Sequence, residues 1–516
     1  MTPPATRLVI KDAMLLTLDR RDRVIPHGYV VLEGDRIAEI GEGVPPQARP
    51  GDRVLEGRNR LVIPGLHNSH THSYENLNRG LMRNIPHAIF MTYPRPPFDA
   101  PVPSPEEVYC RTMLGCLEMV RTGVTLVVDD VVHVPNTDMA AVEAVMQAYQ
   151  DIGLRAVVTG TTVNRLYHET FPYSEQVFPE SILRQFRELP RPTVAELIKF
   201  ARRCLERWPP RARVSFALSP STPQHCSREL LEALRDLQAE SGALLAIHIL
   251  ETRLQAVAGQ VLFGTSMAAY IDELGVLGPG TSVFHGVWLD QDDVRRIAGS
   301  GATVVHSPSS NLKIGSGVAR IREILQAGIP VALGTDSMGS NDSQSIFEEM
   351  RLSGFISSLV SPRYEEWLSP GEVLRMATQG GLRVLRLETE LGTLEAGRLA
   401  DLALLDLSTI AFTPTNDVVR QLVNSERGGS VRTVIVGGQI LMEEGNITAV
   451  DEVKMLARIR EAALAYKNGY EAGWRRSREL EPYFAEIYRR ASAQPVRHSP
   501  RLLWTAECAD ALGTTP

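Results

Sequence analysis

The chain has 516 residues, of which 43% are hydrophobic and 22% are charged, and its formal net charge is −7. Its mean hydropathy of −0.09 is typical of a globular protein, and its length suits one large domain with additions or several domains. The isoelectric point near 6.0 excludes the basic surface that nucleic-acid binding requires. We therefore expect a small-molecule partner and no nucleic acid.

The cysteines and the N-terminus bear on cellular location. The five cysteines are scattered and form no C-x-x-C pair, which fits a reducing compartment better than a disulfide framework. The segment Met1–Pro4 begins no apolar signal region, and no run approaches about 18 apolar residues. We expect a cytoplasmic protein with no membrane span.

Both ends of the chain carry short runs of alternating polar and apolar residues. These runs occupy residues 7–57 and 393–450, and turn residues such as Gly437-Gly438 separate them. Neither half is long enough to bury a core alone. We expect residues 1–60 and 391–450 to form one composite β-sandwich.

Between these halves, residues 61–390 alternate between predicted strands and predicted helices. The strands are near-continuous apolar runs such as Thr125–Val132, and a helix over Ser104–Thr122 begins with a capping serine followed by a proline. Eight such units predict an α/β fold, the (β/α)8 TIM barrel, interrupted by two long segments at 73–104 and 164–192.

A C-terminal helical arm is predicted over residues 451–493, followed by a tail at 494–516. Its apolar residues repeat at helical spacing, which indicates a packing face or an oligomer contact. The predicted stripe consists of Val453, Leu456, Ile459, Ala463, Leu464 and Tyr466. The arm favours a homodimer or a higher homo-oligomer.

Histidines and an aspartate stand at the ends of the predicted strands. His70 and His72 end the first strand, where their spacing places both side chains on one face. Alone, this pair fits two solvated or core histidines better than a metal site, since two-residue patterns occur often by accident. His248, His285 and Asp336 end the fifth, sixth and eighth strands. TIM-barrel active sites lie at these ends, so the agreement of four strands predicts a metal site.

The motifs around these residues resemble those of the amidohydrolase superfamily, and within it the branch of N-heterocycle deaminases and triazine hydrolases. The resemblance covers nearly the whole chain, including the composite sandwich. The matching segments are Pro64-Gly65-Leu66, His70-Thr71-His72, His248-Ile249-Leu250-Glu251-Thr252, His285-Gly286-Val287-Trp288-Leu289, His306-Ser307-Pro308-Ser309-Ser310-Asn311-Leu312-Lys313 and Gly334-Thr335-Asp336-Ser337.

The resemblance implies one divalent metal ion held by three imidazoles and one carboxylate. The implied ligands are His70, His72, His248 and Asp336. Such a donor set suits Zn²⁺ best, with Fe²⁺ as the alternative. Relatives with two metals bridge them through a lysine or an acid on the fourth strand. Here Val214–Ser219 offers neither, so we expect a mononuclear site.

The resemblance also implies three catalytic residues. Glu251 would shuttle a proton from the attacking water to the ring nitrogen or the leaving nitrogen. Asp336 would accept the remaining proton, and His285 would act as a base beside the metal and stabilise the oxyanion.

Three further polar residues stand where substrate would lie. His133 and Asn164 follow the second and third predicted strands, and His306 ends the seventh. We expect these three to be the substrate-binding candidates, although each residue type equally fits a structural role that satisfies nearby backbone groups.

One segment departs from the family pattern. Nucleoside-type deaminases of this branch carry a glutamate there that holds the ribose hydroxyls. The corresponding stretch here, Ile85–Phe98, is apolar and aromatic, and the first acid is Asp99. A smaller or more apolar substrate fits this segment better than a ribose does.

Three hypotheses follow. The first is a metal-dependent aminohydrolase that attacks an sp² carbon of a nitrogen heterocycle and releases ammonia or an amine. The second keeps the mononuclear site but hydrolyses an amide, urea or carbamate, or removes chloride. The third is a non-catalytic scaffold, which predicts that a ligand or the acid is missing.

Overall fold

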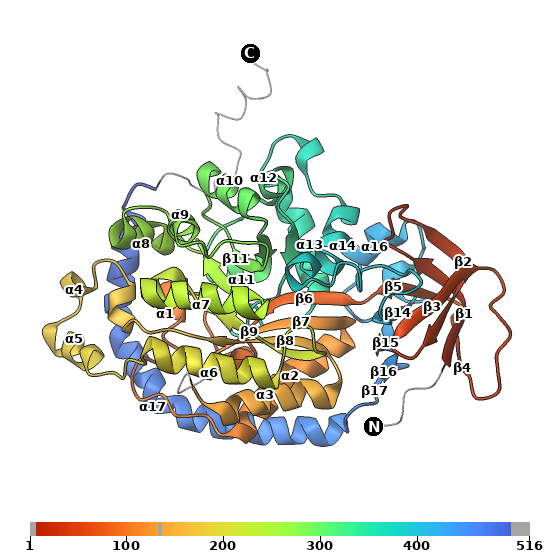
Figure 1. Ribbon diagram of the computed structural model, residues 1–516, viewed down its shortest axis with the longest axis horizontal. Helices are drawn as coiled ribbons and strands as arrows, with labels where there is room; N and C mark the ends of the chain where they lie inside the picture. The colour runs from red at the N-terminus through yellow and green to blue at the C-terminus, as the bar shows by residue number, and fades with distance from the viewer. Residues whose placement is uncertain (1–6, 133–136, 497–516) are drawn as a thin grey trace, which may run out of the picture.

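The computed structural model describes residues 7–132 and 137–496. Within these ranges eight parallel strands pair in chain order around a barrel (Figure 1). The ring closes where Thr71 bridges Asp336 and where the Asp336 backbone N–H donates to the carbonyl of His70 at 2.9 Å. The predicted barrel is confirmed. Its strands are β6 (Leu66–Thr71), β7 (Val124–Val131), β8 (Arg155–Thr161), β9 (Val214–Ser219), β10 (Leu245–Ile249), β11 (Thr281–His285), β12 (Thr303–His306) and β13 (Val331–Leu333).

Helices cover the outside of the barrel and begin where the sequence supplies caps. The Ser104 hydroxyl accepts a hydrogen bond from the Glu107 N–H at the start of α2, with a proline in the first turn. The main outer helices are α2 (Pro105–Arg121), α3 (Met139–Ile152), α6 (Val194–Arg207), α7 (Arg228–Ser241), α8 (Arg253–Phe263), α9 (Met267–Glu273), α10 (Gln291–Ser300), α12 (Ile321–Gln326), α13 (Ile346–Ser357) and α14 (Pro370–Thr378). Short helices α11 (Pro308–Lys313), α15 (Leu382–Leu385) and α16 (Val418–Asn424) lie between them.

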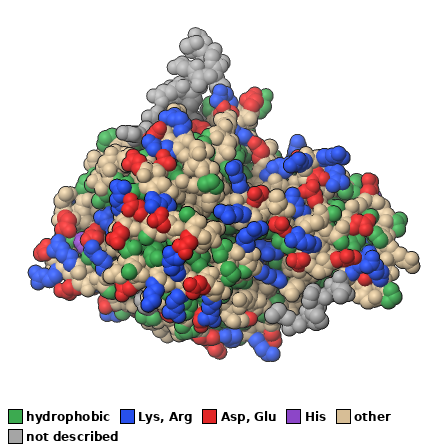
Figure 2. All heavy atoms as spheres, in the orientation of Figure 1, with side chains coloured by type: hydrophobic (Ala, Val, Ile, Leu, Met, Phe, Trp, Pro, Cys, Tyr) green, Lys and Arg blue, Asp and Glu red, His purple; other side chains and the backbone are tan. Residues whose placement is uncertain are grey.

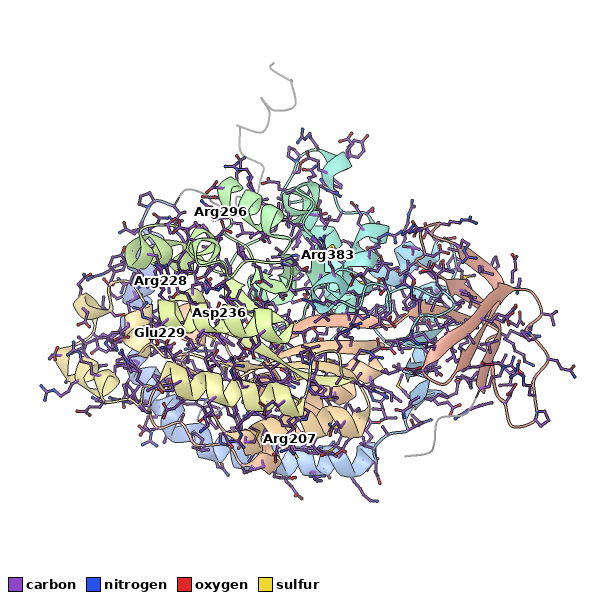
Figure 3. The ribbon with its side chains drawn as sticks, viewed as in Figure 1. Arg207, Arg228, Glu229, Asp236, Arg296 and Arg383 are labelled. Carbon is purple, nitrogen blue, oxygen red and sulfur yellow. The ribbon has the colours of Figure 1, made fainter. Side chains whose placement is uncertain are left out.

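The outward faces of these helices carry charges of both signs. Labelled examples are Arg207 on α6, Arg228 and Asp236 on α7, and Arg296 on α10 (Figure 3). The face drawn in Figure 2 intersperses acidic and basic side chains without a large field of one sign. In the described part of the chain no single helix is long and apolar enough to span a membrane, and only the bent pair of α8 and α9 meets the length and composition criteria jointly.

The two ends of the chain meet in a second sheet. Strand β5 joins them, because it pairs parallel with β1 and antiparallel with β14. Within the described residues the path runs β17-β16-β15-β14-β5-β1-β2-β3, with β4 attached to β1. The strands are β1 (Arg7–Leu16), β2 (Val24–Glu33), β3 (Arg36–Glu42), β4 (Arg53–Glu56), β5 (Arg60–Pro64), β14 (Leu402–Asp406), β15 (Val431–Val436), β16 (Gln439–Glu443) and β17 (Asn446–Ile447).

The chain passes from this sheet into the barrel at Gly65. A Cβ atom on Gly65 would lie 2.0 Å from the Thr125 hydroxyl, so only glycine fits the crossing. The barrel therefore begins with Leu66, whereas the expected boundary at residue 61 falls inside β5. The apolar run Leu61–Ile63 belongs to the sheet because its hydrogen-bond partners are β1 and β14.

The C-terminal arm is one helix, α17 (Glu452–Ser492), which packs along its own barrel. Its buried face includes Met455, Ile459 and Tyr466. The predicted stripe is wrong at Val453 and Leu464, which are 79% and 66% exposed. At about 100° per residue these two positions lie on the side of the helix opposite Met455.

The two long segments, 73–104 and 164–192, contain short helices. The first holds η1 (Ser73–Asn78) and α1 (His87–Phe90), and the second holds η2 (Tyr167–Thr170), α4 (Ser174–Val177) and α5 (Glu180–Arg187). Both segments and the second half of α17 share one apolar cluster, which includes Ile89, Phe178, Phe186, Leu480 and Phe484. The helix thus holds the two segments together beside the barrel.

Candidate metal centre and its pocket

A cavity lies at the C-terminal ends of the barrel strands. Strand ends supply one part of its lining, which we call the strand-end wall: His72, Asp130, His248, His285 and Asp336. The two long segments supply another part, the loop wall: His87, Phe90, Met91, Arg95, Tyr167, Thr170 and Phe171.

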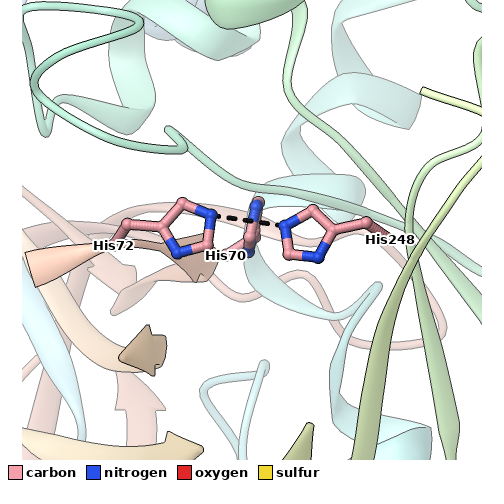
Figure 4. Close-up of side chains that lie close together, drawn as sticks. All are labelled: His70, His72 and His248. Atoms are coloured by element: carbon pink, nitrogen blue, oxygen red, sulfur yellow. Dashed lines mark hydrogen bonds between the residues drawn. The ribbon is translucent and has the colours of Figure 1, made fainter. Parts of the chain in front are cut away.

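The imidazoles of His72 and His248 meet at the centre of the strand-end wall (Figure 4). Their Nε2 atoms are 3.3 Å apart. His72 Nδ1–H donates to the Asp130 carbonyl at 2.6 Å, and His248 Nδ1–H donates to the Ser221 carbonyl at 2.9 Å. These bonds leave a lone pair on each Nε2 atom, and two facing lone pairs need a cation between them.

His70 and Asp336 complete the donor set. Both ring nitrogens of His70 are buried and have no hydrogen-bond partner among the described residues, so a polar group is left unsatisfied unless an ion binds it. Asp336 Oδ1 lies 3.4 Å from His72 Nε2 and 3.7 Å from His70 Nε2. Three bare imidazole nitrogens and a carboxylate fit one divalent metal ion.

The charges around this set favour a cation. Burial and the neighbouring imidazoles lower the pKa of His70 and His248 well below the usual value, so both are neutral donors. Burial opposes protonation of His72 as well, but Asp336 and Asp130 raise its pKa. Asp336 stays ionised because His72 and His285 lower its pKa against the effect of burial.

Hydrogen bonds fix the carboxylate of Asp336. The Ser310 hydroxyl donates to Oδ2 at 2.5 Å, and the Ser337 N–H donates to Oδ1 at 2.8 Å. These partners come from the loops after β12 and β13, so two barrel connections orient one ligand.

The backbone is strained at several residues of the site. His285 and Asp336 have φ angles of 69° and 57°, and Leu250 and Ser221 have 50° and 56°. A side chain in the left-handed region costs about 1–3 kcal/mol. Here it aims His285 and Asp336 at the centre, places Glu251 after Leu250, and presents the Ser221 carbonyl to His248.

Glu251 is a buried acid in the same cavity. Its Oε2 lies 4.0 Å from His285 Nε2 and 3.4 Å from His87 Nε2. Burial, with the charges of Asp336 and Glu75, raises the pKa of Glu251 well above its usual range. Burial lowers the pKa of His87 to about 3, so the contact joins a neutral imidazole to a carboxyl group that can release and regain a proton.

His285 is oriented by Asn311. Its Nδ1–H donates to Asn311 Oδ1 at 2.9 Å, which leaves Nε2 as an acceptor facing Glu251. Burial lowers the pKa of His285. The neutral ring is therefore placed to accept a proton, and it can stabilise an oxyanion only after it has done so.

The structure places two of the three predicted substrate-binding residues, Asn164 and His306, outside the cavity. His133 lies outside the described residues. Asn164 donates to the Ser227 hydroxyl at 2.9 Å and accepts from the Ser227 N–H at 2.8 Å, so its amide holds the start of α7. His306 is buried and lines a separate cavity with Ile321 and Ile356. Neither Asn164 nor His306 lines the cavity of the site.

Sequence reasoning missed several residues that do line it. Glu75 accepts from the Ser337 hydroxyl at 2.5 Å, and Asp130 accepts from the Thr159 hydroxyl at 2.5 Å. Asp130 ends the second strand, so the strand-end rule that selected the histidines also indicates it. No sequence pattern singles out His87, Arg95 or Glu75, because each lies in a long segment between regular elements.

Comparisons with known proteins agree with this geometry. The chain is 31% identical over 458 residues to the 5'-deoxyadenosine deaminase of Methanosarcina barkeri, covering 88% of this chain and 97% of that protein. It is 32% identical over 439 residues to the 5-methylthioadenosine/S-adenosylhomocysteine deaminase of Thermococcus kodakarensis, covering 84% and 94%.

A solved structure shares the whole fold. The zinc-complexed atrazine chlorohydrolase of Arthrobacter aurescens TC1 superposes with a TM-score of 0.78 at 26% identity, covering 88% of this chain and all of that one. The sequence profile named Amidohydrolase family matches residues 61–441. The chain therefore belongs to the amidohydrolase family.

Proposed function

We propose that this hydrolase of carbon–nitrogen bonds removes ammonia or an amine from an sp² carbon of a nitrogen heterocycle, at one zinc ion. The observation that carries the proposal is the convergence of three imidazoles, two of them with Nε2 atoms 3.3 Å apart, on the carboxylate of Asp336 beside the buried acid Glu251. The names of the relatives, which are deaminases of adenine nucleosides, support the substrate class.

A metal ion bound by these residues would lower the pKa of a water to about 7 and would polarise the attacked carbon. The chain's own residues then move the protons. Glu251, buried in the cavity beside His285, would carry a proton from the attacking water to the ring nitrogen. We assign the second proton to His285 Nε2 rather than to Asp336, because Ser310 and Ser337 already hold both carboxylate oxygens of Asp336. The protonated ring of His285 would stabilise the oxygen of the tetrahedral centre.

Two alternatives remain distinct in their products. An amide, urea or carbamate hydrolase would release an amine from an acyclic carbon, and a chlorohydrolase would release chloride, as the name of the Arthrobacter relative indicates for that enzyme. The scaffold hypothesis predicts a missing ligand or acid. His70, His72, His248, Asp336 and Glu251 are all present and close together.

The loop wall supports a substrate without a ribose diol. Among the acids of the two long segments, Glu75 lines the cavity and Asp99 does not. The acids that do, Glu75, Asp130, Glu251 and Asp336, already bond to or face groups of the strand-end wall. The heterocycle, rather than a sugar, is the part of the substrate that this chain shares with its nucleoside-deaminating relatives.

We also propose that the chain works in the cytoplasm as a homodimer or a higher homo-oligomer. The free, buried thiols of Cys110, Cys116, Cys204 and Cys226 suit a reducing compartment. The exposed Val453 and Leu464 on α17 supply apolar surface for a second copy.

A panel of purines, pterins and triazines tests the proposal, with ammonia, amine and chloride release measured separately. The expected result is ammonia or amine release that disappears on metal removal and returns with Zn²⁺. Chloride release alone, or turnover of acyclic ureas alone, would replace the proposal with the corresponding alternative.

A further inference from the structure

Arg95 is the one lysine or arginine among the described residues that line the cavity. Its side chain is half-buried, and no carboxylate of the described residues pairs with it. A guanidinium removed from water normally requires an acceptor, because an unpaired charge is costly to bury. Solvent or a bound molecule therefore supplies the acceptor for Arg95.

The neighbours of Arg95 reinforce its charge. After burial, the positive charge of Arg95 is a cause of the low pKa of His225, which lies at about 3. The same charge contributes to the pKa of about 3 at His87 and acts on the hydroxyls of Tyr74 and Tyr167. Arg95 thus lies among basic and phenolic groups that line the cavity. The acids nearest to these groups face other partners, because Glu251 Oε2 lies 3.4 Å from His87 Nε2 and Glu75 accepts from the Ser337 hydroxyl.

The helix α17 holds the loop that carries Arg95. Trp474 Nε1–H donates to the Tyr93 carbonyl at 3.1 Å, and the Ser477 hydroxyl donates to the Thr92 carbonyl at 2.5 Å. On the other side of Arg95, a Cβ on Gly473 would lie 2.9 Å from Pro96, so the helix backbone touches the loop directly. The backbone of the loop on either side of Arg95 is therefore fixed before a ligand arrives.

Glu481, an acid that contacts this loop, already has hydrogen-bond partners. Glu481 on α17 accepts from the Tyr93 hydroxyl at 2.6 Å and from Arg83 at 2.7 Å. Arg83 and Arg95 belong to one segment, but of the two only Arg83 pairs with the carboxylate of Glu481. The chain leaves Arg95 free to bind something else.

We propose that Arg95 binds an oxyanion carried by the substrate, so that the enzyme prefers a nitrogen heterocycle bearing a carboxylate or phosphate over its neutral counterpart. This inference rests on the proposed deaminase function and extends it to a substrate class. A guanidinium matches a carboxylate or phosphate with two parallel hydrogen bonds. The apolar rings of Phe90 and Phe171, in the same wall, would cover the ring system beside it.

Two matched pairs of probes test this with the zinc-loaded enzyme: pterin against pterin-6-carboxylate, and 5'-deoxyadenosine against adenosine 5'-monophosphate. The first pair reports a carboxylate and the second a phosphate. The wild type should favour the charged member of one pair. Arg95→Gln should lower the ratio of kcat/KM, charged over neutral, by roughly 10- to 100-fold, mainly through KM. Arg95→Lys should restore part of that ratio.

Arg83→Gln is the matched control, because it removes a guanidinium from the same segment outside the cavity, and the ratio should stay unchanged. A wild type that favours the neutral members, or an Arg95→Gln ratio equal to that of the wild type, overturns the inference while the deaminase proposal stands.

If no probe releases ammonia, the proposed function fails on this panel, and calorimetric titration of the four probes then decides the role of Arg95. Tighter binding of a charged member that is lost in Arg95→Gln supports the inference. Equal affinity in the two proteins overturns it.

Discussion

The strand-end wall and the loop wall of one cavity are built in different ways. Every imidazole in the first is fixed by a partner behind it, as His72 is by the Asp130 carbonyl and His285 by Asn311. The loop wall depends on α17, which reaches it from the far end of the chain through Trp474 and Ser477. The difference assigns the chemistry to the barrel and the choice of substrate to the segments that α17 holds.

The largest effect should come from removing a metal ligand. His248→Ala leaves the donor set incomplete, so bound metal should fall to a small fraction of an equivalent and kcat/KM should drop by at least roughly 10³-fold. Metal analysis and activity measured on the same preparation check this. A variant that keeps both would show that His248 is not a ligand.

Glu251→Gln separates proton transfer from metal binding. The amide keeps the shape of the side chain but carries no exchangeable acid, so turnover should fall roughly 10²- to 10⁴-fold while the metal content stays at the wild-type level. Full activity of this variant would remove the proton-shuttle role. Loss of metal would place Glu251 among the ligands instead.

Asn311→Ala tests the partner behind His285 and thus the rigidity of the strand-end wall. Without the Nδ1–H bond the ring can turn, so kcat should fall roughly 10- to 100-fold with KM little changed. Asn311→Asp retains an acceptor and should recover part of kcat. A change confined to KM would assign Asn311 to substrate binding rather than to positioning.

The double variant Trp474→Phe, Ser477→Ala loosens the loop wall alone. It removes the hydrogen bonds to the Tyr93 and Thr92 carbonyls, each worth about 1 kcal/mol. KM should rise several-fold, whereas metal content and the pH profile of kcat should match the wild type. Loss of metal in this variant would show that the two walls are not independent.

The smallest expected effect is a change in stability, from a substitution at Glu372, which lies outside both walls. Burial disfavours ionised Glu372, but hydrogen bonds from Arg322 and Ser369 lower its pKa from 4.5 to about 2. A lowered pKa adds stability above pH 4.5 that is lost as the pH falls toward 2. Glu372→Gln should therefore be less stable than the wild type at pH 7, with the difference shrinking below pH 4.5, as denaturant titrations would reveal. Activity should not change.

The strand-end wall was predictable because one rule covers it. Apolar runs of strand length place their last residues at one end of a parallel barrel, and His70, His72, His248 and Asp336 obey that rule. The rule fails where a side chain after a strand points away from the cavity. Asn164 follows the third strand, but its amide donates to the Ser227 hydroxyl.

The loop wall was not predictable, because its geometry depends on contacts between residues far apart in the chain. No sequence feature distinguishes Arg95 from the other arginines. Its place in the cavity depends on the hydrogen bonds by which Trp474 and Ser477 hold its loop. The buried face of α17 was likewise misjudged at Val453 and Leu464, since helical spacing alone does not say which side meets the barrel.

The most direct test of the account is the number and surroundings of bound metal ions in the wild-type protein, from elemental analysis combined with X-ray absorption at the zinc edge. The account predicts one ion for each chain, with three nitrogen neighbours and oxygen completing the shell. Two ions for each chain, or an ion without histidine neighbours, would contradict it.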